Sequence, residues 1–170
     1  DAVREAAERE MGVAREIQRG ILPADLALLA SGTGLELAAL VDPARQVGGD
    51  FFEVLRLDED TLLVALGDVM GKGIPASLFM AMAVTLLRTL ARVYRTPAEI
   101  LRQLNIELGA HNPRRLFVTL ACLSIHLPTR IVTGANAGHC PVALVPASGE
   151  PRTVLRPTGP VVGILPNPTY

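Results

Sequence analysis

Residues 47–73 read VGGDFFEVLRLDEDTLLVALGDVMGKG, and the rest of the chain is organised around this stretch. It contains two short apolar runs, 51–57 and 61–66, joined by the charged turn 58–60. This pattern predicts a β-hairpin, and the uninterrupted apolar residues 62–66 are typical of a buried strand. Asp50 lies where the first strand begins and Asp68 where the second ends. An antiparallel pairing would therefore bring the two carboxylates together at one edge of the core.

The two aspartates indicate a site for a divalent cation. Neighbouring carboxylates repel each other unless a cation lies between them, and Mg²⁺ and Mn²⁺ prefer oxygen ligands of this kind. The alternative is that Asp50 and Asp68 are ordinary turn residues at strand ends. A Gly-Asp pair at both ends of one hairpin favours the metal site.

Glycines around the aspartates fit the same hypothesis. Gly48 and Gly49 allow a close backbone approach or a positive φ just before Asp50, and two further glycines do so before a predicted helix. A phosphate-binding loop of the Walker type is excluded by its spacing. Three residues rather than four follow Gly67 before the next glycine, and neither Ser nor Thr follows the lysine.

Four segments together resemble the SpoIIE/RsbU branch of the metal-dependent (PPM-type) protein serine/threonine phosphatases. In chain order they are VGGDF at 47–51, GDVMGKGIPAS at 67–77, FVT at 117–119 and NAGH at 136–139. The resemblance extends from about Met11 to Tyr170. It implies an α+β fold in which two antiparallel β-sheets pack face to face with helices on the outside, an α-β-β-α sandwich. It also implies a hydrolase acting on phosphoserine or phosphothreonine, usually of a small anti-sigma-factor antagonist, in stress-response signalling through sigma-factor regulation.

The resemblance further implies a site for two Mn²⁺ or Mg²⁺ ions. Asp68 would bridge both ions, the backbone carbonyl of Val69 would bind one, and Asp50 would bind directly or through waters. The ions would convert a shared water into a hydroxide that attacks the phosphate in line, without a phospho-enzyme. Arg45 is a candidate for binding the substrate phosphate, because a guanidinium matches phosphate oxygens. The alternative for Arg45 is a solvated surface arginine.

Two further metal-binding aspartates of that family have no counterpart in this sequence. The last carboxylate side chain is Glu150, so we expect the domain, residues 22–170, to be incomplete at its C-terminal end and to be a poor enzyme alone. Two functions stay open. One is a phosphoprotein phosphatase, and the other is a non-catalytic phosphoprotein-binding regulatory module with the same fold.

Composition excludes several classes of protein. The chain has 170 residues, 49% of them hydrophobic, which is enough for one domain with its own core. Its formal net charge of −1 argues against a nucleic-acid surface. The longest charge-free apolar stretch, 73–87, is too short to span a bilayer, and no signal peptide opens the sequence, so a cytoplasmic protein is expected. Cys122 and Cys140 fit neither a disulfide framework nor a zinc site, and we expect both to be small buried residues.

Residues 1–21 are expected to form a charged linker helix that ends before Pro23. A possible apolar stripe along it consists of Val3, Ala6, Val13 and Ile17. One interpretation is a connection to an upstream sensor domain, or a homodimer contact, in a longer protein. The other is an amphipathic helix packed on its own domain.

Two helices are expected after Asp68, at about 75–94 and 97–109. Pro75 suits the first turn of one, and residues 96–99, TPAE, form a capping box for the other. The segment 76–84 is apolar nearly all round, which predicts burial on several sides. The resemblance implies that this pair is a regulatory switch, and a lid on the core alone is the alternative. The candidate switch residues are Pro75, Met82, Leu86, Leu101 and Leu104.

Further strands are expected at 35–41, 116–127, 131–135 and 142–145, with an extended loop at 157–170. His139 lies at the end of one of these strands. A lone histidine in such a place is more often a hydrogen-bonded structural residue than a catalytic one, and we favour the structural role.

Overall fold

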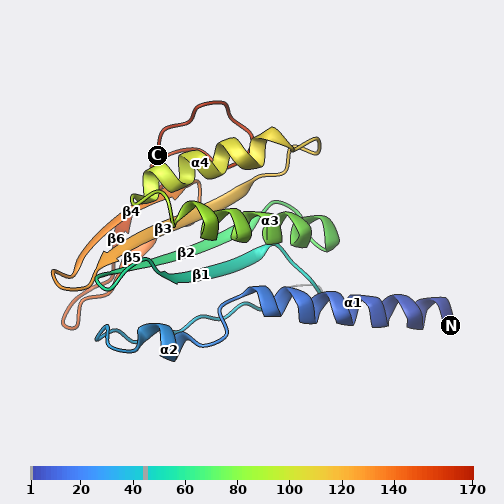
Figure 1. Cartoon of the computed structure of the whole chain (residues 1–170), viewed down its shortest axis with the longest axis horizontal. Coiled ribbons are helices and arrows are strands. Elements are labelled where there is room, and N and C mark those ends of the chain that lie inside the picture. The colour runs from blue at the N-terminus through green and yellow to red at the C-terminus, as the bar shows by residue number, and fades with distance from the viewer. Residues whose placement is uncertain (1, 44–45) are drawn as a thin grey trace.

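The computed structural model describes residues 2–43 and 46–170 (Figure 1). Its helices and strands are, in order, α1 (Ala2–Ile21), α2 (Leu26–Ala30), β1 (Asp50–Arg56), β2 (Thr61–Val69), α3 (Ile74–Leu90), α4 (Pro97–Ala110), β3 (Val118–His126), β4 (Ile131–Ala137), β5 (Val142–Leu144) and β6 (Arg152–Leu155). Within the described ranges, no helix combines the length and the apolar character that a bilayer crossing requires.

The predicted hairpin is confirmed and forms one half of a four-stranded antiparallel sheet of order β1-β2-β3-β4. Asp50 pairs directly with Asp68, and Phe51 pairs with Gly67. Because side chains alternate between the faces of a sheet, the two aspartates share one face and the Phe51–Gly67 pair shares the other. The absence of a side chain at Gly67 is required, since a Cβ there would lie 2.4 Å from the Phe51 ring.

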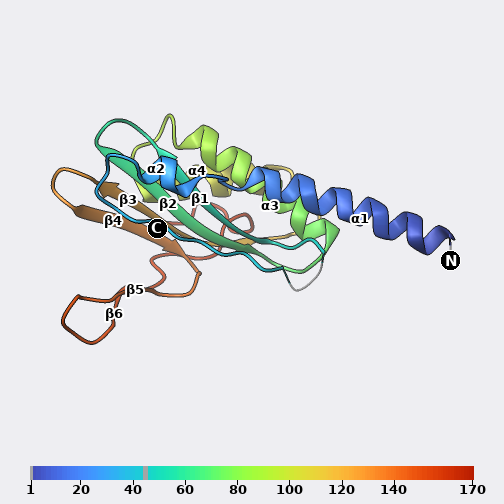
Figure 2. The ribbon, with the colours of Figure 1, turned by 90° about the horizontal axis from the view of Figure 1, so that it is seen from below.

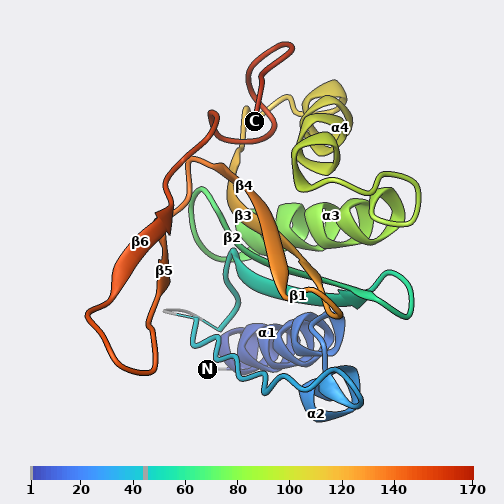
Figure 3. The same ribbon diagram turned by 90° about the vertical axis from the view of Figure 1, so that its left-hand side faces the viewer.

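Helices α3 and α4 cover the face that carries Phe51 (Figure 3). Phe51 and Leu63 of the sheet belong to one fully buried cluster with residues of both helices, among them Met80, Leu87, Ile100, Leu101 and Leu104. β5 and β6 pair as a second, two-stranded antiparallel sheet on the side away from these helices. The expected α+β class, with antiparallel sheets and helices, is confirmed.

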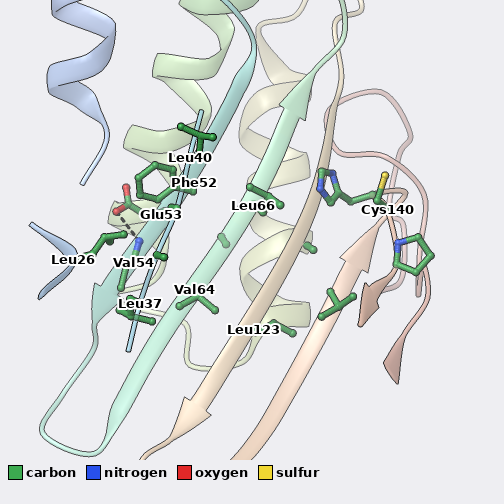
Figure 4. Close-up of a pocket in the computed structure, with 17 residues that line it drawn as sticks. Leu26, Leu37, Leu40, Phe52, Glu53, Val54, Val64, Leu66, Leu123 and Cys140 are labelled. Carbon is green, nitrogen blue, oxygen red and sulfur yellow. Dashed lines mark hydrogen bonds between the residues drawn. The ribbon is translucent and has the colours of Figure 1, made fainter. Parts of the chain in front are cut away.

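The other face of the four-stranded sheet is hollowed by an apolar cavity of about 520 Å³ (Figure 4). Its lining includes Phe52 and Leu66 from the hairpin and Leu37 and Leu40 from the chain before it. The prediction of a strand at 35–41 is wrong, because this segment joins no sheet. Leu35 and Leu37 instead pack beside a small cluster on the sheet, whereas Leu40 is 89% exposed.

The C-terminal part contains one element that the sequence did not reveal. β6 has mainly exposed side chains, so it lacks the apolar alternation by which a strand is recognised. Residues 157–170 form the expected extended loop. The loop returns to the main sheet through isolated bridges, Val118 with Val162 and Ala137 with Gly159.

The prediction that α3 is buried on several sides is confirmed in part, since the helix contacts the sheet, α4 and α1. Ala76, Met80 and Leu87 face the sheet, but Leu78 and Met82 are 65% and 41% exposed. The side of α3 that carries Leu78 and Met82 is therefore the part that stays exposed. Thr96 is the N-cap of α4, with its hydroxyl accepting from the Glu99 amide and donating to the Glu99 carboxylate, so the first half of the predicted capping box is present.

α1 confirms the expected N-terminal helix, and its first half extends beyond the sheet (Figures 1 and 2). The predicted apolar stripe does not pack on the domain, since Val3, Val13 and Ile17 are 86%, 56% and 63% exposed. The helix contacts α3 instead, where Met11 and other residues of α1 border a shallow groove.

The two cysteines have different surroundings. Cys122 is buried, as expected, and burial raises the pKa of its thiol to about 12. Cys140 is exposed, so the expectation of burial is wrong for this residue. It lies in the turn after β4, at the border of the sheet, where little of the chain covers it.

Candidate metal centre

Asp50 and Asp68 lie side by side at one end of the four-stranded sheet, where β1 begins and β2 ends. They are direct cross-strand partners, and paired residues of antiparallel strands have Cα atoms about 5 Å apart. Both are exposed. The hairpin register therefore brings together the two carboxylates that the sequence predicted to converge.

The electrostatics of the pair favour a bound cation. Loss of solvation beside the neighbouring strands raises the pKa of Asp68, although its side chain is exposed by surface area, and the negative charge of Asp50 raises it further. A raised pKa means that the ionised carboxylate is disfavoured where it stands. A divalent ion between the two groups would remove this penalty.

The backbone around the pair is also shaped for a ligand site. Gly49 lies so close to the neighbouring strand that a Cβ would fall 2.6 Å from the carbonyl oxygen of Val69. The Val69 amide donates to the Gly49 carbonyl at 3.2 Å. Only glycine at this position keeps the Val69 carbonyl, the third predicted oxygen ligand, free of a side chain.

The donor set fits a hard divalent ion but supplies few ligands. Carboxylate and carbonyl oxygens suit Mg²⁺ and Mn²⁺. In residues 2–43 and 46–170, no three acidic, histidine or cysteine side chains are grouped to hold a metal ion. Asp50 and Asp68 are therefore the two side chains that the described residues offer to a metal ion. Arg45, the predicted phosphate-binding residue, lies outside the described residues.

Thr119 and His139 extend the row of polar residues next to the aspartates. Thr119 is the cross-strand partner of Asp68 on β3, and its Oγ1 lies 2.8 Å from Nδ1 of His139. Burial lowers the pKa of His139, while the charge of nearby Asp50 acts in the opposite direction. The sequence analysis gave Thr119 no role and His139 a structural one, although both lie in the quoted segments FVT and NAGH.

Two contacts from distant elements hold the start of the hairpin. The side chain of Gln18 on α1 makes two hydrogen bonds with the backbone of Gly48. Glu53 on β1, which is 2% exposed, accepts from Arg88 of α3 at 2.6 Å. The same guanidinium donates to the carbonyl of Ile21 at the end of α1. None of these contacts had a recognisable motif in the sequence.

The arrangement of the sheets and helices is that of a PP2C-type domain. The SiaA-PP2C domain of Pseudomonas aeruginosa superposes with a TM-score of 0.81 at 22% identity, over 95% of this chain and 65% of that one. RsbX in complex with magnesium superposes with a TM-score of 0.59 at 22% identity, over 75% of this chain and 60% of that one. At these identities the likeness shows the fold.

The family follows from the sequence comparison. The family model of Stage II sporulation protein E (SpoIIE) matches residues 58–170, and the chain belongs to this family. The expected SpoIIE/RsbU branch is thereby confirmed.

Curated relatives are longer than this chain. Protein IcfG of Synechocystis sp. is 29% identical over 95% of this chain and 29% of its own length. Phosphoserine phosphatase RsbU of Bacillus subtilis is 27% identical over 82% of this chain and 40% of its own length. The chain therefore spans less than half the length of these relatives.

Proposed function

We propose that this domain is a metal-dependent protein serine/threonine phosphatase. It would hydrolyse phosphoserine or phosphothreonine on a regulatory protein of the anti-sigma-factor antagonist type, in the cytoplasm. The observation that carries the proposal is the direct pairing of Asp50 with Asp68 at the edge of a PP2C-type sheet. Membership of the SpoIIE family and similarity to the phosphoserine phosphatase RsbU support the reaction class.

The residues of the pair would bind and orient the metal. Asp68 would bridge two Mn²⁺ or Mg²⁺ ions, Asp50 would hold one of them, and the Val69 carbonyl would add an oxygen ligand. Bound divalent ions would supply an activated water at neutral pH and screen the phosphate charge. Arg45 would bind the phosphate of the substrate through its guanidinium.

The regulatory part of the proposal concerns α1, α3 and α4. Residues 1–21 would link residues 22–170, the phosphatase domain, to an upstream sensor domain or to a second copy. Gln18 and Arg88 support such a connection, since their hydrogen bonds join α1 and α3 to the hairpin that carries Asp50. The switch would involve Pro75, Leu86, Leu101 and Leu104, whereas Met82, the fifth candidate from the sequence, is 41% exposed and is better suited as a control.

A phosphoprotein-binding module without catalysis is the second candidate. The finding that favours it is the small number of metal-binding side chains in the described ranges. Phosphate release from a phosphoserine protein at increasing Mn²⁺ concentration separates the two functions. Turnover that depends on Mn²⁺ and disappears in Asp68→Asn supports the phosphatase. Binding of the phosphoprotein without turnover, by a protein that also binds Mn²⁺, would support the module.

A further inference from the structure

The turn between β4 and β5 places His139 beside the aspartate pair. Its Nδ1 lies 2.8 Å from Oγ1 of Thr119, and Thr119 is the cross-strand partner of Asp68. The charge of Asp50 acts on the imidazole, and Thr119 connects the ring to the backbone of Asp68. His139 nevertheless makes its hydrogen bond to Thr119 rather than to either aspartate.

The turn is constructed to hold the histidine in this place. Asn136 is fully buried, accepts from the His139 amide at 2.8 Å and donates to the Cys140 carbonyl at 3.3 Å. Gly138 has φ +63°, and a Cβ on it would lie 2.8 Å from a methyl group of Val161. A buried amide and a left-handed glycine thus fix the backbone on both sides of the imidazole.

The hydrogen bonds around Thr119 indicate which groups donate and which accept. Its hydroxyl donates to the backbone carbonyl of Asp68 at 3.4 Å. If the single hydrogen of the hydroxyl is used in that bond, the hydrogen in the shorter contact comes from Nδ1 of His139, a role that depends on the tautomer of the ring. This arrangement requires a neutral imidazole protonated at Nδ1, and the chain of donors then runs from His139 through Thr119 to Asp68.

We propose that His139 is a positioning residue for the metal centre, acting through the Thr119 hydroxyl on the backbone of Asp68. This inference rests on the proposed function only in taking Asp50 and Asp68 as metal ligands. His139 fixes the rotamer of Thr119, and Thr119 holds the end of β2 where the carboxylate of Asp68 and the carbonyl of Val69 must face the same ion. Partners of this kind, which orient a ligand without touching the metal, typically change metal affinity about 10- to 100-fold.

The test measures Mn²⁺ binding by the whole chain, without substrate, from the electron paramagnetic resonance signal of free Mn²⁺. His139→Ala and Thr119→Val should each weaken binding roughly tenfold, and the double variant should be no weaker than the worse single one, because both remove the same contact. His139→Asn should restore most of the affinity, since its amide nitrogen can take the place of Nδ1. His139→Gln should not, since its amide lies further from the backbone.

A second pair in the same protein provides a matched control. His126 and Thr129 make the same type of contact, with Nδ1 and Oγ1 2.7 Å apart, at an exposed turn after β3. His126→Ala and Thr129→Val should leave Mn²⁺ affinity unchanged. In addition, ¹⁵N NMR of the metal-free protein should show His139 protonated at Nδ1. The tautomer protonated at Nε2 would overturn the direction of the hydrogen bonds and, with it, the proposal.

The remaining outcomes separate this proposal from the proposed function. If His139→Ala lowers the melting temperature but leaves Mn²⁺ affinity unchanged, His139 is structural and the inference is wrong. If the wild-type chain binds Mn²⁺ through Asp68 and the His139 variants behave as stated, the inference holds even when no phosphoprotein is hydrolysed. Failure of the wild-type chain to bind Mn²⁺ would overturn both.

Discussion

The side-chain amide of Gln18 is hydrogen bonded to both backbone groups of Gly48. The amide nitrogen donates to the Gly48 carbonyl at 2.6 Å, and the Gly48 amide donates to the side-chain oxygen at 3.1 Å. Gln18 is 8% exposed and is the buried residue of α1. Because Asp50 follows two residues later, the position of α1 is connected directly to the backbone of the candidate metal centre.

Replacement of Gln18 should therefore affect both stability and metal binding. A net contribution of about 1 kcal/mol for each hydrogen bond predicts that Gln18→Ala lowers the free energy of unfolding by about 2 kcal/mol. It should also weaken Mn²⁺ binding, because Gly48 is no longer held. Urea denaturation and a Mn²⁺ titration measure the two effects. Glu16→Ala, at an exposed position of the same helix, should change neither.

The buried pair of Glu53 and Arg88 should contribute strongly to stability. Desolvation raises the pKa of Glu53 even though Arg88 acts to lower it, so the carboxylate depends on its partner. Removing one member of a buried pair leaves the other uncompensated, which typically costs 3–5 kcal/mol. Since Arg88 is 36% exposed, we expect Arg88→Met to destabilise the protein by about 3 kcal/mol in urea denaturation.

The exposed pair of Arg95 and Asp58 is the control for that experiment. Its N–O distance is 3.5 Å, and the two side chains are 60% and 49% exposed. Surface pairs of this kind contribute about 0–1 kcal/mol, so Arg95→Met should have a small effect. An equal loss of stability in Arg88→Met and Arg95→Met would contradict the role assigned to the Glu53–Arg88 pair.

Asp68→Asn should stabilise the metal-free protein and abolish its response to metal. The pKa of Asp68 is raised in the folded state, so its contribution to stability is present below the ordinary pKa of aspartate and is lost as the pH rises through the folded value. A neutral asparagine does not undergo this loss. At pH 7 and without metal, the melting temperature of the variant should be equal to or higher than that of the wild type.

Addition and removal of Mn²⁺ complete this test. A ligand at ten times its dissociation constant stabilises the native state by about 1.4 kcal/mol, which for a domain of this size corresponds to roughly 3–5 °C. The wild type should gain this increment, and EDTA should reverse it. Persistence of the increment in Asp68→Asn would show that the metal binds elsewhere.

The central part of the fold was predictable because it is encoded locally. The apolar runs, the charged turn and the glycines of residues 47–73 specify the hairpin, and the hairpin register specifies the contact between Asp50 and Asp68. The N-cap at Thr96 likewise marks the start of α4. In each case the residues that form the structure are neighbours in the sequence or in a single hairpin.

The features that escaped prediction depend on contacts between distant segments. Gln18 and Gly48 are 30 residues apart, and Glu53 and Arg88 are 35 apart. The exposed side of α3 could not be recognised either, because an apolar sequence does not state how many of its faces are covered. Met82 is the clearest example, since it is apolar and yet 41% exposed.

A test of the proposed switch in α3 and α4 requires a substitution at a residue that packs on the core, because Met82 is exposed. Leu86 is half-buried against the main core cluster. Leu86→Ala should lower stability by about 2 kcal/mol and also weaken Mn²⁺ binding, since α3 follows Asp68 after a short loop. Met82→Ala, on the exposed side, serves as the control. If Leu86→Ala changes the melting temperature but not the Mn²⁺ affinity, the helices are only a cover for the core.

The exposed stripe of α1 should mediate self-association. Val3, Val13 and Ile17 are each more than half exposed, although Ile17 and Glu10 also border the groove between α1 and α3. With Ala6 and position 10 they follow alternating steps of three and four residues, the spacing by which two helices pack along a seam. Glu10 occupies one seam position and would weaken the contact. Two helices of this length bury a modest area, so the isolated chain should form a weak, concentration-dependent dimer.

Sedimentation velocity over a range of concentrations tests this association. The wild-type chain should shift towards the dimer as concentration rises, and Val13→Glu should remain a monomer because it places a second carboxylate in the seam. Glu10→Leu should have the opposite effect, since it completes the apolar stripe and should strengthen the dimer several-fold. Arg9→Leu adds the same apolar side chain one position away from the seam and should change little. Equal sedimentation of all four chains would show that α1 does not associate with a second copy, and the helix would then be limited to connecting the domain with another part of a longer protein.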